Sequence, residues 1–236
     1  MTTTDAARYD GSADWYDKYN APAAEQHAAD LATLLGHGDG WCLDLGCGTG
    51  QYLDTIRGTG RTVVGLDYSA DQLRVAARRD HPLVRGDGAA LPFAGGTFST
   101  VVTMWLSTDV DDFSAVLREA FRVLQPGGLL VFVGAHPCFN GPGVESRDDG
   151  SVVVHPAYRT AGWHETSPWW NPGGIRGRTG MRHVPLAELI NAFIDAGFSI
   201  ESVGEPGARP VPYAFTVRSR RMSSERVADG EQASTR

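Results

Sequence analysis

From residue 41 to residue 135, short runs of apolar residues alternate with stretches in which apolar positions recur at helical spacing. The runs predict strands, and the stretches between them predict helices. Expected strands cover residues 41–45, 62–67, 82–86, 98–105, 129–135, 198–203 and 212–218, and expected helices cover residues 51–57, 69–79, 111–124 and 185–196. Because parallel strands need long crossovers, this order predicts a doubly wound, mostly parallel seven-stranded α/β sheet that ends in an antiparallel pair.

Three segments lie outside this alternation. Residues 12–35 predict helix, with Pro22 expected to divide it in two. Residues 136–184 are rich in Gly, Pro, His and Trp and too long for an ordinary connection, so we expect a lid over a binding site. Residues 219–236 predict a disordered tail. The expected organisation is a single domain over residues 1–218, with a helical cover over residues 1–38 and the lid inserted over residues 136–184.

Composition narrows the classes of function. The net charge of −7 disfavours a nucleic-acid partner, because binding a polyanion needs a basic face. No apolar run approaches the roughly 20 residues of a membrane span, and the polar start lacks a signal core, so we expect a cytoplasmic protein without a membrane partner. The three cysteines lack CxxC spacing, which predicts neither disulfides nor a metal site.

The stretch "CLDLGCGTG" at residues 42–50 carries the strongest chemical signal. An apolar strand leads directly into Gly46, Gly48 and Gly50 and then into a helix, an arrangement that lets the backbone approach a ligand closely. Its spacing is GxGxG, whereas a dinucleotide fingerprint reads GxGxxG. Asp44 precedes the loop, and its carboxylate would repel a pyrophosphate but suit a cationic amine. The loop therefore disfavours a nicotinamide dehydrogenase.

Two more acids follow at the ends of the next expected strands. Asp67 ends the second strand in "VVGLDYS", where an acid can accept hydrogen bonds from both ribose hydroxyls. Asp87 and Gly88 follow the third strand in "GDGAALPF", where an acid can accept from an adenine amino group. Acids at three successive strand ends, with a glycine loop at the first, predict a nucleoside site.

In these motifs the chain resembles the class I S-adenosylmethionine-dependent methyltransferases, specifically the small-molecule branch related to the quinone-biosynthesis methyltransferases. The resemblance rests on "LDLGCGTGQYL", "VVGLDYSADQL", "GDGAALPFAGGTFSTVV" and "REAFRVLQPGGLLVF". It implies S-adenosylmethionine as cofactor and S-adenosylhomocysteine as product. It also implies that Asp44, Gly46, Cys47 and Gly48 border the methionine part, that Asp67 binds the ribose, and that Tyr68, Asp87 and Gly88 contact the adenine. Ser99 stands where such enzymes commonly have an aspartate.

Methyl transfer is an in-line displacement, so the protein must mainly align the acceptor at about 3–3.5 Å and exclude water. A general base is needed only if the acceptor must lose a proton. Trp105 after the fourth expected strand and His136 after the fifth are expected near the transferring methyl group. In similar methyltransferases an N-terminal helix covers the cofactor. We expect Tyr16 to contact the cofactor and Trp15 to dock the helix.

The lid carries the dense aromatic stretch "RTAGWHETSPWW" at residues 159–170. We expect Trp163, Trp169 and Trp170 to bind a planar or apolar part of the acceptor, and Arg176 to help clamp a carboxylate or phosphate on it. His164 and His136 are the candidate bases. The predicted function is methyl transfer to oxygen, nitrogen or carbon of a small molecule. Two alternatives stay open: a methyl-neutral reaction such as cyclisation or elimination on the same fold, and a non-catalytic S-adenosylmethionine-binding partner. The sequence leaves the oligomeric state open.

Overall fold

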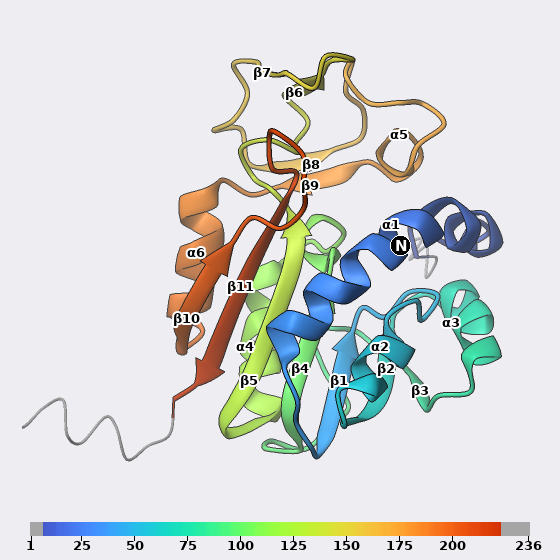
Figure 1. The fold of residues 1–236 in the computed structure, drawn as a ribbon, viewed down its shortest axis with the longest axis vertical. Coiled ribbons are helices and arrows are strands. Elements are labelled where there is room, and N and C mark those ends of the chain that lie inside the picture. Colours follow the sequence, from blue (N-terminus) through green and yellow to red (C-terminus); the bar gives the residue numbers. More distant parts are fainter. Residues whose placement is uncertain (1–6, 223–236) are drawn as a thin grey trace, which may run out of the picture.

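The sheet of the protein is seven-stranded, in the order β10-β11-β5-β4-β1-β2-β3 (Figure 1). The computed structural model describes residues 7–222. The strands are β1 (Trp41–Leu45), β2 (Thr62–Asp67), β3 (Leu83–Arg85), β4 (Phe98–Met104), β5 (Leu124–Ala135), β10 (Phe198–Gly204) and β11 (Ala214–Arg221). Strands β3, β2, β1, β4 and β5 are parallel, whereas β11 is antiparallel to both neighbours. The predicted sheet and its antiparallel ending are confirmed.

Helices cover both faces of this sheet. The helices of the main fold are α1 (Ala13–Leu35), α2 (Leu53–Gly58), α3 (Ala70–Ala76), α4 (Phe113–Val123) and α6 (Leu186–Asp195), with short 3-10 turns η1 (Ala77–Arg79) and η2 (Leu106–Thr108). One apolar core packs α4 and α6 against one face, and a second packs α1 and α2 against the other. Because strands β1 and β4 lead to opposite halves of the sheet, their carboxyl ends form the crevice in which ligands of open α/β sheets bind.

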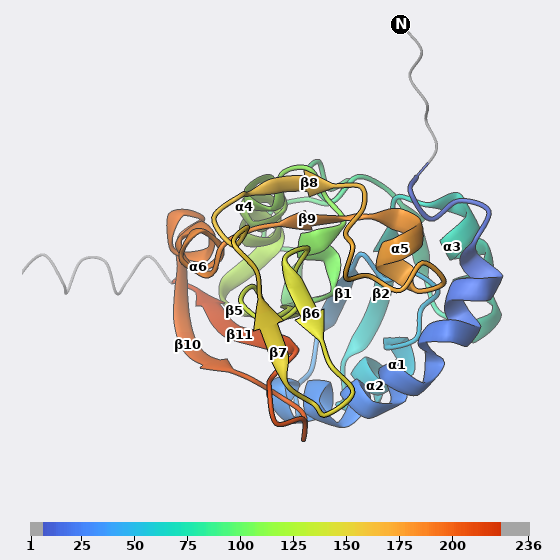
Figure 2. The ribbon, with the colours of Figure 1, turned by 90° about the horizontal axis from the view of Figure 1, so that it is seen from above.

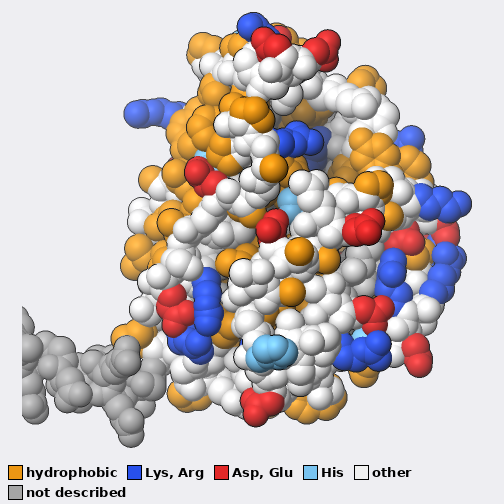
Figure 3. All heavy atoms as spheres, in the orientation of Figure 1, with side chains coloured by type: hydrophobic (Ala, Val, Ile, Leu, Met, Phe, Trp, Pro, Cys, Tyr) orange, Lys and Arg blue, Asp and Glu red, His pale blue; other side chains and the backbone are white. Residues whose placement is uncertain are grey.

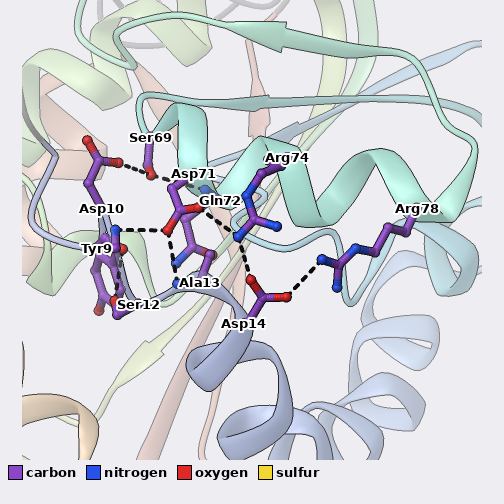
Figure 4. Close-up of polar contacts among 11 residues, drawn as sticks. Tyr9, Asp10, Ser12, Ala13, Asp14, Ser69, Asp71, Gln72, Arg74 and Arg78 are labelled. Atoms are coloured by element: carbon purple, nitrogen blue, oxygen red, sulfur yellow. Dashed lines mark hydrogen bonds and ion pairs between the residues drawn. The ribbon is translucent and has the colours of Figure 1, made fainter.

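Helix α1 runs without interruption through Pro22, so the predicted division at this proline is wrong. A proline inside a helix removes one backbone hydrogen bond, and this helix is held at both ends by side chains from elsewhere in the chain. Asp71 accepts hydrogen bonds from the backbone N–H groups of Gly11 and Ala13 at its start (Figure 4). Arg61 donates to the carbonyl oxygen of Leu35 at its end. Tertiary contacts thus offset the local cost.

Charged side chains of both signs are interspersed on the side of the molecule formed by α1, α2 and α3 (Figure 3). Asp14 of α1 pairs with Arg74 of α3 and Arg78 of η1, as Figure 4 shows. Asp17 pairs with Arg79 at 2.8 Å. These ion pairs fix the first half of α1 against the α3 region.

The predicted lid lies above the carboxyl ends of the strands, where Figures 1 and 2 show it as a separate layer. It contains two short antiparallel pairs, β6 (Val144–Ser146) with β7 (Val152–Val154) and β8 (Gly162–His164) with β9 (Met181–His183), and the short helix α5 (Ile175–Thr179). Its position confirms an insertion after β5, although its strands were not predicted.

Strand β11 continues to Arg221, so the first residues of the predicted tail belong to the sheet instead. This strand pairs with β5 on one side and with β10 on the other, and backbone pairing extends it through residues 219–221, whose polar side chains did not indicate a strand. The rest of that predicted tail, residues 223–236, lies outside the described residues. Within residues 7–222, no helix combines the length and apolar character needed to cross a bilayer.

Candidate functional site

A cavity of about 680 Å³ opens at the carboxyl ends of β1, β2 and β4. This volume lies within the range of about 300–1,000 Å³ typical of small-molecule sites. Eight of the residues expected to bind cofactor line it: Tyr16, Gly46, Gly48, Asp67, Tyr68, Asp87, Gly88 and Trp105. Residues from five separate stretches of the sequence therefore meet at one site, and four of these stretches follow strands, as the strand-end pattern predicts.

The glycine loop forms one side of the cavity. Gly46, Gly48 and Gly50 have φ angles of 78°, 52° and 79°, values that strongly favour glycine. A Cβ at Gly46 would lie 2.8 Å from Leu106, so this position also has no room for a side chain. The N–H of Gly46 donates to the carbonyl oxygen of Leu66, which ties the loop to β2. The loop is thus a rigid surface that a ligand can approach at backbone distance.

Asp67 is oriented by two backbone donors. Its carboxylate accepts hydrogen bonds from the N–H of Gly48 at 2.8 Å and from the N–H of Ser69 at 2.9 Å. Burial raises the pKa of Asp67 above its ordinary value, although these two hydrogen bonds act in the opposite direction. The carboxylate also lines the cavity. A carboxylate has about four acceptor positions, so this arrangement leaves acceptor capacity for ligand hydroxyls.

Asp44 and Cys47 lie behind this wall and do not line the cavity. Asp44 is completely buried, and neither of its carboxylate oxygens has a hydrogen-bond partner within the described part of the chain. Burial first, and then the charge of Asp67, raise the pKa of Asp44 to about 7. Burial likewise raises the pKa of the Cys47 thiol. A buried acceptor without a partner suits a site that receives a cation nearby.

Gln72 is a cavity residue that the sequence interpretation missed. It is buried, lines the cavity, and has no hydrogen-bond partner for either amide atom among residues 7–222. The hydroxyl of Ser69 caps α3 by accepting a hydrogen bond from the backbone N–H of Gln72, which fixes the start of this helix beside Asp67. A helix-capping serine followed by glutamine three residues later was the available signal.

The opposite wall of the cavity is aromatic. Tyr16 lines the cavity from α1, and its ring meets the edge of Tyr9 at a centroid distance of 5.3 Å. Trp105 lines it after β4, in the left-handed region with φ 65°. The indole N–H of Trp105 donates to the hydroxyl of Tyr52, and its ring stacks on Tyr213 at 5.5 Å. A non-glycine residue held in this region by several contacts is typical of functional sites.

The segment of residues 7–12 precedes α1 and borders the cavity; we call it the N-terminal strap. Its backbone is fixed by Asp71, as described above, and the hydroxyl of Ser69 donates to Asp10 at 2.5 Å (Figure 4). Tyr9 and Arg8 of the strap line the cavity. The strap therefore joins the cavity wall to α3 beside Asp67.

Neither candidate base faces the cavity in this structure. His136 is buried, with Nε2 2.9 Å from Glu205 and Nδ1 accepting the backbone N–H of Cys138. His164 lies with Nε2 3.1 Å from the carbonyl oxygen of Thr160. Both imidazoles are engaged within the lid and its connections. Their catalytic role stays a prediction.

The lid tryptophans also lie away from the cavity lining. Trp163 packs under the guanidinium of Arg8 at 3.8 Å, and Trp169 stacks on His155 at 4.1 Å. Trp170 is half-buried within the same loop. Trp15 of α1 stacks on Tyr19 and receives the guanidinium of Arg178 from α5 at 4.0 Å, which is a docking contact. Aromatic rings thus join the lid to the N-terminal part, and direct acceptor contacts by these tryptophans stay predicted.

Arg176 reaches the cavity wall indirectly. Its guanidinium donates to Asp109 and to the hydroxyl of Thr108, both at 2.6 Å, and Asp109 lines the cavity. The residues described contain no cluster of three or more His, Cys, Asp or Glu side chains that could hold a metal ion.

Comparison with known proteins agrees with this arrangement. A family model described as a methyltransferase domain matches residues 43–132. A demethylmenaquinone methyltransferase of Mycolicibacterium vanbaalenii is 44% identical over 89 residues, which are 38% of this chain and 39% of that protein. One from Lactococcus lactis is 36% identical over 138 residues, covering 52% of this chain and 55% of the relative. The chain therefore spans about two fifths to just over half of these relatives.

Similarity in fold to a solved structure extends over more of the chain than the sequence matches do. The crystal structure of an S-adenosylmethionine-dependent methyltransferase from Mesorhizobium loti is similar with a TM-score of 0.67 and 26% identity, over 90% of this chain and 99% of that one. Residues 43–132 therefore match a methyltransferase domain, the fold is similar to that of an S-adenosylmethionine-dependent methyltransferase, and the chain is similar in part to proteins named demethylmenaquinone methyltransferase.

Proposed function

We propose that the protein transfers a methyl group from S-adenosylmethionine to a small-molecule acceptor and releases S-adenosylhomocysteine. One observation carries the proposal: the glycine loop, Asp67 and Asp87 meet around a single cavity of about 680 Å³. The fold and the domain match support the same reading.

The residues of the cavity fit the parts of this cofactor. Asp67 and Gln72 would hold the ribose hydroxyls, because they place a fixed acceptor and an unpartnered amide side by side. Tyr68, Asp87 and Gly88 would hold the adenine. The glycine loop would contact the methionine part, with the Asp44 carboxylate behind it favouring the ammonium group. The cofactor supplies an electrophilic methyl group on a sulfonium.

Around the reacting centre this chain contributes alignment and exclusion of water. Trp105 and Tyr16 offer aromatic surface to a cation, an interaction of about 0.5–2 kcal/mol. The strap and η2 close the cavity from the side. In-line displacement gains mainly from such positioning. A base becomes necessary only for an acceptor that must lose a proton, and His164 and His136 remain the predicted candidates.

For the acceptor we propose an aromatic small molecule with an electron-rich ring, such as a hydroquinone. The support comes from the relatives named demethylmenaquinone methyltransferase, whose similarity covers part of each chain. The boundaries of one domain at residues 1–218, and a cytoplasmic location, stay predictions that accompany this proposal.

The test uses the full chain with S-adenosylmethionine labelled in its methyl group. Hydroquinones, phenols and amines are supplied in turn, and both S-adenosylhomocysteine and methylated product are measured by mass spectrometry. We expect matched amounts of both with one acceptor class, and loss of both with Asp67→Asn. Consumption of an acceptor without S-adenosylhomocysteine would overturn the proposal in favour of a methyl-neutral reaction. Tight cofactor binding without turnover of any acceptor would favour a binding partner.

A further inference from the structure

Arg176 forms the centre of a polar contact between the lid and the cavity wall. It extends from α5, and its guanidinium donates to Asp109 Oδ1 and Thr108 Oγ1 at 2.6 Å each. The side chains of Arg176 and Asp109 are only 20% and 16% exposed. Arg176 is not among the residues that line the cavity. Its positive charge is therefore paired with Asp109 of the protein itself.

Asp109 also contacts the strap. The hydroxyl of Tyr9 donates to the same Oδ1 atom at 3.1 Å, and the Tyr9 ring packs edge-on against Tyr16. Asp109, Tyr9 and Tyr16 all line the cavity. Burial, followed by the charge of Asp109, raises the pKa of the Tyr9 hydroxyl, so it remains the donor at physiological pH. A continuous set of contacts thus joins the lid to the aromatic wall.

Arg8 makes a second connection between the same three parts. Its guanidinium donates to the backbone carbonyl of Asp109 and to the carboxylate of Asp111, both at 2.7 Å, and stacks on Trp163 of the lid at 3.8 Å. At the other end of the strap, Asp10 accepts from Ser69, whose N–H donates to Asp67. The strap therefore lies between the lid and the proposed ribose-binding carboxylate.

We propose that Arg176 is a positioning residue that holds the strap closed through Asp109 and thereby couples the position of the lid to retention of the cofactor. The inference rests on the proposed function and changes the role expected for Arg176, from a direct clamp on the acceptor to an internal one. Removing the guanidinium leaves the Asp109 carboxylate partly buried without its cation, which favours its movement toward water. Tyr9 then loses its fixed acceptor, and the wall beside Tyr16 loosens.

The test compares Arg176→Met with Arg159→Met, an exposed arginine of the same lid. Dissociation of S-adenosylhomocysteine from the full chain is followed by stopped-flow tryptophan fluorescence. Because loss of a buried charged partner acts mainly on dissociation, we expect Arg176→Met to dissociate about 10-fold faster with a nearly unchanged association rate. Arg159→Met should match the wild type. Unchanged dissociation in Arg176→Met would overturn the inference.

Two further variants separate positioning from general loss of folding. Tyr9→Phe removes one hydroxyl and no packing, and it should speed dissociation in the same direction by about 3-fold, as expected for one hydrogen bond. The double variant Arg176→Met with Asp109→Asn should dissociate no faster than Arg176→Met alone, because the two residues act through one contact. Additive effects would contradict the coupling.

The outcomes also separate this inference from the proposed function. If the wild-type chain does not bind S-adenosylhomocysteine, the proposed function fails. If the wild type binds it and Arg176→Met raises only the KM for the acceptor, the residue is a clamp on the acceptor and the inference fails.

Discussion

At the residue scale, Asp67 is a cavity-lining side chain whose carboxylate is oriented by the local backbone. Two backbone N–H groups donate to the two oxygens of its carboxylate. Asparagine has only one side-chain oxygen, so one of these N–H groups would face an NH₂ group and lose its acceptor. Hydrogen bonds to charged groups contribute about 1.5–3 kcal/mol, so Asp67→Asn should weaken S-adenosylhomocysteine binding by roughly 10- to 100-fold in calorimetry. Asp54→Asn, in an exposed ion pair on α2, serves as the control. Equal affinities would show that Asp67 does not hold the ligand.

Gln72 allows a test in which stability and binding move in opposite directions. Its buried amide has no partner in the described structure, so Gln72→Leu removes an uncompensated polar group. We expect the free protein to gain about 1 kcal/mol of unfolding free energy, while S-adenosylhomocysteine binding weakens by about 10-fold or more. Thermal unfolding with and without the ligand measures both effects. A loss of stability in the free protein would indicate that the amide has a structural role.

The raised pKa of Asp44 leads us to expect that cofactor binding depends on pH. The pKa of Asp44 is about 7 in the folded protein, above its ordinary value of 3.8. Between these two values the folded protein holds a proton that the unfolded chain releases. The contribution of this group to folding stability therefore declines as the pH rises toward 7. A cationic ligand favours the ionised form, so binding should release a proton and strengthen as pH rises from 5.5 to 7.5. Calorimetry in buffers of different ionisation enthalpy detects the proton. Asp44→Asn should remove the proton release; if it persists, another group is responsible.

The residues that the sequence could predict are those whose role follows from their place in the chain. Gly46, Gly48 and Asp67 are recognisable because each stands at the end of an apolar strand, and parallel strand ends meet at one edge. Arg8 and Asp109 escaped prediction because their contact joins positions about a hundred residues apart. No local pattern records such a pairing.

At the scale of elements, the end of α1 is held by the side chain of Arg61, the residue immediately before β2. Arg61 is buried and donates to the carbonyl oxygens of Leu35 and Gly36, which would otherwise lack partners at the helix end. Arg61→Met should lower the free energy of unfolding by about 1–3 kcal/mol, measured by urea denaturation. Arg57→Met, in an exposed pair, should change it by less than about 0.5 kcal/mol. Similar losses in the two variants would rule out a specific role at the helix end.

Helices and strands could be predicted from the sequence where the pattern of apolar residues was long and clear, and could not where the elements were short. Strands β1, β2 and β4 and the second half of β5 are apolar runs buried on both faces, a pattern typical of parallel strands in the middle of a sheet. Strands β6, β7, β8 and β9 have three residues each, too few to show a period. Pro22 led to the opposite error, the prediction of a helix break that does not exist. Contacts at the two ends of α1 outweigh the tendency of proline to interrupt a helix.

At the scale of the whole molecule, the lid is joined to the N-terminal part largely by arginines and aromatic rings. Arg8 stacks on Trp163, and Arg178 stacks on Trp15. The sequence identified the aromatic density of the lid but not which surfaces the rings cover, because an indole packs equally well against a ligand or an arginine. The described structure shows these two indoles as contacts between layers.

Because Arg8 of the strap stacks on Trp163, we expect this ring to help hold the strap closed. A cation–π contact contributes about 0.5–2 kcal/mol, so Trp163→Leu should speed amide hydrogen exchange in residues 7–12 by roughly 2- to 30-fold. Exchange within β1 and β4 should not change, because these strands lie in the core. Trp41→Leu, at the exposed start of β1, is the matched control and should leave the strap unaffected. If Trp163→Leu exchanges like the wild type in residues 7–12, the strap is held by its contacts with α3 and η2 alone, and the lid does not govern access to the cavity through this ring.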